Sequence, residues 1–358
     1  IPWRSETSFP APKKMMTADD TLKADTAYRL ACEGTGIIWS GDFQNAKQLL
    51  QALQRRVEKA ISYPNKTLAA GELFHLHRKN QAHKARILSM LLIPIEADLS
   101  IQLRRAPDAS VALSEVYGKN SGPFLCSLRE ILGFIGAHEW RKKGVPLASL
   151  GFTIHPHYGV FSPARGEYLD LIQNAQLPAT DLALDIGTGT GVIAALLAKR
   201  GVQKIIATEQ NPRAIACAEE NILKLGLQSQ IEIQNADLFP NKKAPLIVCN
   251  PPWIPAKPTS IIEYAIYDFE SKMLKGFLLG LSDHLLPNGE GWLILSDIAE
   301  HLGLRTREEL LDLFAKGNLK VIERIDTKPK HAKTKDTTDP LYEARKKEIT
   351  SLWRLARD

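Results

Sequence analysis

The sequence contains the stretch Asp185-Ile186-Gly187-Thr188-Gly189-Thr190-Gly191, which decides the fold. It follows the short apolar run Leu182-Ala183-Leu184 and leads directly into the apolar segment 192–198. This order predicts a strand, a tight glycine turn and a helix. Glycine is needed where a ligand approaches the backbone, because it has no Cβ and tolerates positive φ. The amides at the start of the new helix would then face that ligand.

A second apolar run, Ile205-Ile206-Ala207, ends close to Glu209. Nucleotide-binding α/β sheets keep a carboxylate at about this distance from the glycines for ribose hydroxyls. The dinucleotide pattern G-x-G-x-x-G does not fit, because position 192 is Val192. The pattern D-x-G-x-G-x-G instead resembles the cofactor loop of class I S-adenosylmethionine (SAM) methyltransferases. A glycine turn alone is also compatible with a purely structural connection.

The second motif is Asn250-Pro251-Pro252-Trp253, which follows the apolar run 246–249. It resembles the (N/D)-P-P-(Y/F/W) signature of methyltransferases that modify an amino nitrogen, either an exocyclic base amine or the side-chain amide of glutamine. Such a nitrogen is a poor nucleophile because its lone pair is delocalised. The Asn250 side-chain oxygen and the Pro251 carbonyl would each accept one N–H, which favours a pyramidal nitrogen. The ring of Trp253 would stack on the flat target.

The resemblance covers residues 150–358 and implies SAM as cofactor, with S-adenosylhomocysteine as product. It implies that the glycine turn holds the methionine end, Glu209 the ribose and Asp237 the adenine amino group. Leu238 and Phe239 are expected to flank the adenine ring. The residues expected to bind the cofactor are Asp185, Gly187, Thr188, Gly189, Gly191, Glu209, Asp237, Leu238, Phe161 and Asn250. Those expected to act in catalysis are Asn250, Pro251 and Trp253.

The fold class that we expect is α/β, a Rossmann-like seven-stranded class I methyltransferase sheet with a mostly helical N-terminal domain. Residues 1–145 would form the N-terminal domain and recognise the substrate, 146–168 a connector or lid, and 169–358 the methyltransferase domain. In the connector, Phe161, Arg165 and Glu167 are candidates for a lid over SAM. The alternative is a linker that packs Phe161 in the core.

The first half of the sequence contains two predicted helices and a group of three histidines. An apolar stripe with a three- and four-residue period predicts a helix that begins after Asp42 as N-cap. The segment 127–143 predicts another helix. His75, His77 and His83 suggest a metal, but no cysteine or carboxylate cluster lies near them in the sequence, so we expect no metal site.

The composition is that of an ordinary globular protein, with 358 residues, 44% of them hydrophobic and 24% charged. We find no apolar run of membrane-spanning length and no secretory signal, and we expect no membrane partner. The four cysteines are scattered without a C-x-x-C pair, which indicates neither zinc nor a disulfide framework. A reducing cytoplasm is the expected location.

The net charge of +6 is unevenly distributed. Residues 1–150 hold 21 of the 46 Lys and Arg residues but only 14 of the 40 Asp and Glu residues, and the remainder of the chain is slightly acidic. A basic N-terminal module would suit a nucleic acid partner. A solvated charged surface explains the same excess.

Three functions remain open. The first is a nucleic-acid N-methyltransferase, on ribosomal RNA rather than DNA, which the basic first half and the Lys-rich loop 328–335 favour. The second is a protein glutamine N5-methyltransferase of the release-factor or ribosomal-protein type, which the lid-like segment 161–167 favours. The third is a SAM-binding protein without catalysis, against which the intact Asn-Pro-Pro-Trp argues. The modified atom and the oligomeric state do not follow from the sequence.

Overall fold

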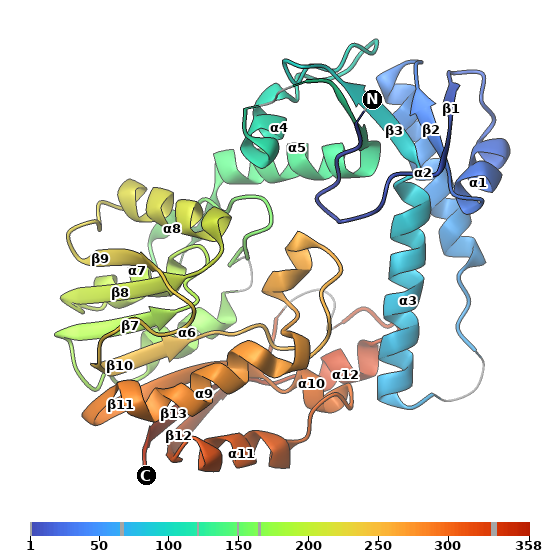
Figure 1. The fold of residues 1–358 in the computed structure, drawn as a ribbon. Helices are drawn as coiled ribbons and strands as arrows, with labels where there is room; N and C mark the ends of the chain where they lie inside the picture. The colour runs from blue at the N-terminus through green and yellow to red at the C-terminus, as the bar shows by residue number, and fades with distance from the viewer. Residues whose placement is uncertain (1, 65–67, 120–121, 149, 164–165, 331–334) are drawn as a thin grey trace. The chain divides into compact units, whose positions relative to one another are not determined.

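The computed structural model describes residues 2–64, 68–119, 122–148, 150–163, 166–330 and 335–358. Within it the chain divides into two compact units (Figure 1). Unit 1 comprises Ile1–Leu68 and Glu72–Glu139, and unit 2 comprises Ala69–Gly71 and Trp140–Asp358. Among the helices of the described residues, none combines the length and the hydropathy of a membrane span.

Unit 1 is built on a four-stranded sheet in the order β1-β2-β3-β4. The strands are β1 (Lys14–Ala18), β2 (Thr35–Trp39), β3 (Leu91–Ile95) and β4 (Phe124–Ser127). The helices are α1 (Ala24–Cys32), α2 (Phe43–Ala60), α3 (Ala70–Leu88), α4 (Ser110–Tyr117) and α5 (Leu128–Lys143), of which α3 and α5 also reach into unit 2. Helical residues outnumber strand residues in this unit, but its four-stranded sheet is not predicted from the sequence. The helices α2 and α5 lie where the sequence predicts them, and Asp42 caps α2 by accepting from the Gln44 amide at 2.8 Å.

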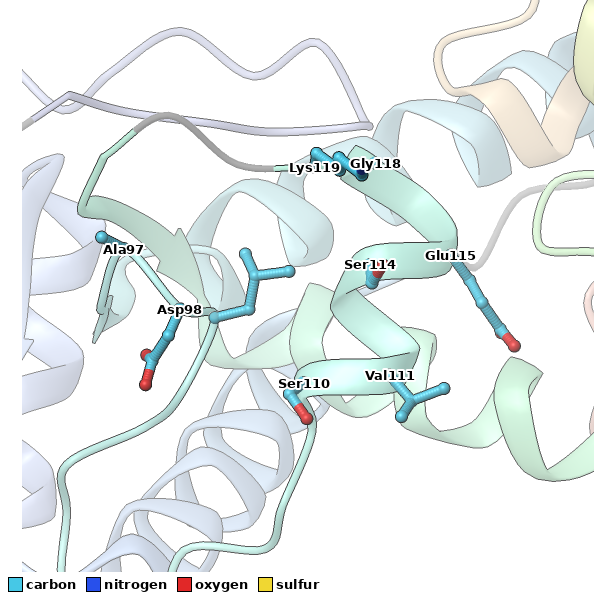
Figure 2. Close-up of a pocket in the computed structure, with 9 residues that line it drawn as sticks. Ala97, Asp98, Ser110, Val111, Ser114, Glu115, Gly118 and Lys119 are labelled. Carbon is cyan, nitrogen blue, oxygen red and sulfur yellow. The ribbon is translucent and has the colours of Figure 1, made fainter.

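A hollow of about 620 Å³ lies in unit 1, between the turn after β3 and helix α4 (Figure 2). Its lining mixes small, apolar and charged side chains, namely Ala97, Asp98, Leu99, Ser110, Val111, Ser114, Glu115, Gly118 and Lys119. None of the residues that the motifs single out lines this hollow.

Unit 2 contains a seven-stranded sheet in the order β12-β13-β11-β10-β7-β8-β9. The strands are β7 (Leu182–Ile186), β8 (Lys204–Glu209), β9 (Ile231–Asn235), β10 (Ala244–Cys249), β11 (Leu285–Ser296), β12 (Leu319–Thr327) and β13 (Thr350–Arg357). All neighbours from β11 to β9 are parallel, whereas β13 runs antiparallel to both β11 and β12. The last two strands, β12 and β13, therefore form an antiparallel pair at one edge of the sheet.

The helices of unit 2 are α6 (Glu167–Asn174), α7 (Val192–Lys199), α8 (Pro212–Lys224), α9 (Lys272–His284), α10 (Ile298–His301), α11 (Arg307–Lys316) and α12 (Tyr342–Lys347), with the short turns η1 (Ile261–Ala265) and η2 (Phe269–Ser271). Most of these helices lie between successive strands in the chain, but α6 precedes β7 and β9 leads to β10 without a helix. A small hairpin, β5 (Val145–Leu147) with β6 (Phe152–Ile154), precedes them.

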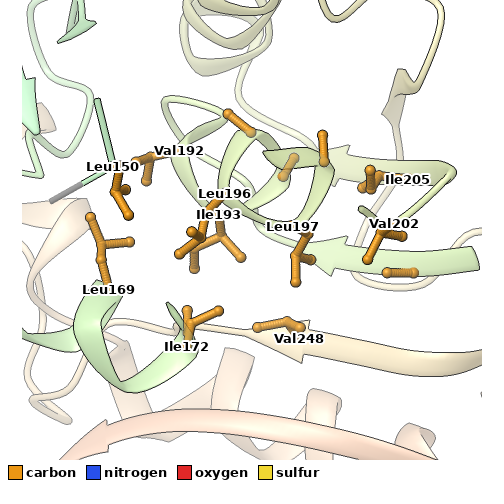
Figure 3. Packing of buried hydrophobic residues seen from close by; sticks show 14 of the residues in the cluster. Leu150, Leu169, Ile172, Val192, Ile193, Leu196, Leu197, Val202, Ile205 and Val248 are labelled. Atoms are coloured by element: carbon orange, nitrogen blue, oxygen red, sulfur yellow. The ribbon is translucent and has the colours of Figure 1, made fainter. Parts of the chain in front are cut away.

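Two apolar clusters cover the two faces of this sheet. Successive side chains of a strand point to opposite faces, so Leu246 and Val248 of β10 join one cluster, and Ile247 and Cys249 join the other. The first cluster contains α6 and α7 (Figure 3), and the second contains α9 and α11. The sheet is therefore buried between helices on both of its faces.

The position of β7 creates the site. This strand pairs with β8 on one side and with β10 on the other. The helices α7 and α8, which follow β7 and β8, pack on one face of the sheet, whereas α9, which follows β10, packs on the other. Open parallel sheets bind ligands at such a switch point, beyond the carboxyl ends of the strands. The glycine turn follows β7, Glu209 is the last residue of β8, and Asn250 follows β10, all at this edge.

Shortening one side chain of the first cluster tests this packing. Leu196 on α7 is fully buried, and its replacement by alanine should lower the free energy of unfolding by about 2–5 kcal/mol, because it leaves a cavity. Leu223→Ala on α8 is the control, because that side chain is 61% exposed and its loss should cost less than about 0.5 kcal/mol. Urea unfolding monitored by circular dichroism gives both values. Equal losses would contradict the assigned burial.

Candidate functional site at the carboxyl ends of the central strands

The glycine turn has the backbone that its sequence requires. Gly187, Gly189 and Gly191 have φ of +70°, +57° and +80°, in the left-handed region that side chains disfavour. The turn is fixed to the next strand, because the Thr188 amide donates to the Thr208 carbonyl at 2.9 Å. A Cβ on Gly189 would have no described atom within 4 Å, so the turn is open at its middle glycine.

Asp185 is the buried anchor of this turn. Its Oδ2 accepts from the Thr188 hydroxyl at 2.6 Å and from the Ala194 amide at 3.0 Å, which ties strand, turn and helix together. Its Oδ1 is buried without a hydrogen-bond partner among the described residues. Burial raises the pKa of this carboxyl to about 7, although the two hydrogen bonds oppose the rise. An unused buried acceptor is costly and indicates a donor on a missing ligand.

Glu209 ends β8 and faces the same turn. Its Oε2 accepts from the Gly189 amide at 3.2 Å. Its Oε1 accepts from the amides of Gln210 and Asn211 at 2.9 and 3.0 Å. The carboxylate therefore lies beside the middle glycine, where the sequence predicts a ribose-binding group.

The residues after β9 divide between the site and the core. Asp237 is exposed on a bend. Leu238 has a left-handed φ of +65°, and its carbonyl accepts from the Thr208 hydroxyl at 2.6 Å. Phe239 is stacked on His284 with ring centroids 4.2 Å apart, so its ring packs on α9. Its expected place beside the adenine ring stays a prediction.

The tetrapeptide lies at the end of β10, next to the glycine turn. Val248 is in register with Asp185, and Cys249 with Ile186, so both motifs leave the sheet at the same level. Asn250 is half-buried, and its Oδ1 accepts from the Trp253 indole Nε1 at 2.9 Å. The ring of Trp253 packs against both apolar clusters and is partly buried.

The connector differs from the expected lid. Phe161 packs against the first apolar cluster, with its ring centroid 6.4 Å from that of Tyr168. Burial of the aromatic ring explains this placement, which matches the alternative of a linker anchored in the core. Arg165 lies outside the described residues, and Glu167 begins α6.

Asn221 is a site residue that the motifs do not reveal. It is fully buried in α8, where its Nδ2 donates to the Thr190 carbonyl at 3.0 Å and its Oδ1 accepts from the His155 amide at 2.8 Å. It thereby joins the glycine turn to the connector. A signal exists in the sequence, because this polar residue falls on the apolar stripe of the helix with Ala214 and Cys217.

The loop after Trp253 is closed at its base. The Asp268 amide donates to the Ile254 carbonyl at 2.9 Å, and the Asp268 carboxylate accepts from the Met273 and Leu274 amides at 3.0 Å each. Burial raises the pKa of Asp268. Helix α9 then supports the cofactor turn, because a Cβ on Gly187 would lie 2.4 Å from the Met273 methyl. The described residues contain no group of three or more His, Cys, Asp or Glu side chains placed to hold a metal.

The sequence is similar to those of known methyltransferases. Residues 151–314 match the family model of the methyltransferase small domain. A putative protein N5-glutamine methyltransferase from Methanocaldococcus jannaschii is 31% identical over 153 residues, which cover 40% of this chain and 75% of that protein. The chain belongs to this family of SAM-dependent methyltransferases.

Other relatives match over shorter shares of their length. A release factor glutamine methyltransferase from Cereibacter sphaeroides is 42% identical over 95 residues, 26% of this chain and 34% of that one. A tRNA1(Val) (adenine(37)-N6)-methyltransferase from Bacteroides fragilis is 34% identical over 145 residues, 36% of this chain and 61% of that one. A methyltransferase of known structure from Pyrococcus furiosus has a TM-score of 0.41 and 20% identity, over 63% of this chain and 98% of that one.

Membership confirms the predicted family, the class I fold and SAM as the methyl donor. The residues at the switch point fit this cofactor. Asp185 offers a buried acceptor that lacks a donor, Glu209 presents a carboxylate, and the space beside Gly189 is open.

Asp185 makes the folding stability depend on pH. Because burial raises its pKa from 3.8 to about 7, the folded chain binds an extra proton between these values. The free energy of unfolding contributed by this group therefore falls as the pH rises from about 4 to about 7. Asp185→Asn cannot titrate and should flatten the dependence. Urea unfolding of both proteins across this range measures the effect, and parallel curves would contradict it.

Proposed function

We propose that this methyltransferase transfers the methyl group of SAM to an amino nitrogen. One observation carries the proposal: Asn250-Pro251-Pro252-Trp253 leaves β10 in register with the glycine turn at the end of β7. The acceptors for an amine and the turn for the cofactor thus start from paired residues of neighbouring strands. Curated relatives in the family are named for glutamine N5 and adenine N6 methylation.

The cofactor-binding roles follow the chemistry of the donors and acceptors. We assign Asp185 and the turn from Gly187 to Gly191 to the methionine end, with the free Asp185 Oδ1 as an acceptor for its ammonium. Glu209 would accept from the ribose hydroxyls, and Asp237 with Leu238 would contact the adenine. When bound, SAM supplies a methyl group activated by a sulfonium.

Asn250 and Pro251 would prepare the nucleophile. The Asn250 Oδ1 has two lone pairs, of which the Trp253 indole uses one, so the second is available to an amine. The Pro251 carbonyl would accept the other N–H, and proline adds no competing backbone donor. Holding both hydrogens directs the lone pair of the nitrogen, so positioning supplies most of the rate. No strong base is needed, because the nitrogen becomes acidic as it gains positive charge.

For the substrate, we propose an exocyclic base amine of RNA. The excess of Lys and Arg over Asp and Glu lies in residues 1–150, which suits a module that contacts phosphate. A base in a duplex would have to be flipped out to reach Asn250. Residues 331–334 of the Lys-rich loop lie outside the described part of the chain. The scattered cysteines lead us to place the reaction in the cytoplasm.

The second candidate is a protein glutamine side chain. It is favoured by the relatives from Cereibacter sphaeroides and Methanocaldococcus jannaschii, which are named as glutamine methyltransferases. A glutamine amide presents the same flat NH₂ group, so the same acceptors would serve. The two candidates differ in the macromolecule, and not in the chemistry at Asn250.

Removing the side-chain acceptor tests the reaction. Asn250→Ala should reduce methyl transfer by about 100-fold or more, because the target amine loses a positioned acceptor, while the SAM dissociation constant stays within about twofold. Calorimetric SAM titration and tritium transfer give the two numbers. Wild-type activity in this variant would refute the assigned role.

The substrate class is tested by labelling. Lysate is incubated with the protein and tritiated SAM and is then treated separately with RNase, DNase or protease. We expect RNase to release the label. Release by protease alone would support the glutamine candidate and refute the RNA proposal. The Asn250→Ala variant serves as the control for background labelling.

A further inference from the structure

The hydrogen bond between Trp253 and Asn250 has a defined direction. The indole Nε1–H is a donor only, and it lies 2.9 Å from the Asn250 Oδ1. A side-chain amide has an acceptor at one end and two donors at the other. The contact therefore selects the orientation of the carboxamide, with Oδ1 toward the indole and Nδ2 away from it.

We propose that Trp253 is a positioning residue that holds the Asn250 carboxamide in its accepting orientation. This inference rests on the proposed function and extends the stacking role expected for an aromatic residue at this place. A flipped carboxamide would present N–H groups to a target that itself presents N–H groups, and the two would repel. The indole disfavours the flip, because the flipped amide would leave its N–H facing another donor.

The packing of Trp253 makes this control effective. Its ring is half-buried and contacts both apolar clusters, which cover opposite faces of the sheet. Asn250 follows directly on Cys249, the fully buried last residue of β10. The indole is therefore held by contacts with the hydrophobic core, and its N–H is directed at the Asn250 Oδ1.

Of the aromatic residues that could stand at position 253, tryptophan brings an indole N–H donor. Phenylalanine fits the same tetrapeptide signature and would also stack on a flat target, but it has no donor. Trp253→Phe therefore separates the two roles. We expect the rate of tritium transfer at saturating SAM and substrate to fall about five- to tenfold, the cost of one hydrogen bond. The SAM dissociation constant should not change.

The matched experiment repeats this change in an Asn250→Asp background. A carboxylate has two equivalent acceptor oxygens and no wrong orientation, so Trp253→Phe should reduce the rate clearly less there than in the wild type. The assay uses the lysate fraction that the nuclease experiment identifies. Equal losses in the two backgrounds, or no loss in the wild type, would overturn the positioning role. Near-normal activity of Asn250→Ala would instead refute the proposed function.

A second measurement needs no substrate. In protein labelled with ¹⁵N-tryptophan, the indole signal that disappears in Trp253→Phe belongs to Trp253 and is one of six. We expect it to shift upfield and its N–H to exchange faster with water in Asn250→Ala, because its acceptor is gone. An unchanged signal would show that the hydrogen bond is not formed in solution and would refute the inference.

Discussion

The carboxylate of Asp185 is the contact on which the site depends. A single oxygen, Oδ2, receives the Thr188 hydroxyl and the Ala194 amide, so the strand, the glycine turn and the following helix share one acceptor. A fully buried carboxyl is expensive to ionise. Its second oxygen, Oδ1, has no hydrogen-bond partner among the described residues. This oxygen is an acceptor at the place where a cofactor would bring a donor.

The turn itself is held from several sides. Glu209 binds the Gly189 amide from β8, Asn221 binds the Thr190 carbonyl from α8, and Met273 touches Gly187 from α9. Each of these three residues belongs to a different element, namely β8, α8 and α9. The turn needs these contacts because glycine adopts negative φ as readily as positive φ, so the residue type alone does not fix the conformation. A preformed turn spares the ligand part of the cost of ordering the chain.

The methyltransferase sheet was predictable because its strands are short apolar runs separated by glycine, proline and polar residues. The first unit was harder. The strand β3 continues an apolar run that begins in the buried end of α3, and periodicity alone does not separate helix from strand in such a run. The strand β1 has an exposed burial pattern without alternation.

In the site, the motifs located the backbone and the polar groups but not the aromatic rings. From the sequence, Phe161 and Phe239 are both expected to lie beside the cofactor. In the structure, the Phe161 ring packs on Tyr168 and the Phe239 ring on His284. The direction of a large side chain depends on tertiary neighbours that a local pattern does not contain. The same holds for Trp253, whose indole contact with Asn250 follows from its packing on the core.

The place of β13 has a consequence for how unit 2 is assembled during synthesis. This strand, Thr350–Arg357, lies between β11 and β12, although both precede it in the chain. Until it leaves the ribosome, β12 has no neighbour in the sheet, and β11 has an open edge of hydrogen-bonding groups. The strands from β9 to β11 are therefore synthesised well before β13 covers the edge of β11. In that interval the exposed edge needs protection against pairing with other chains.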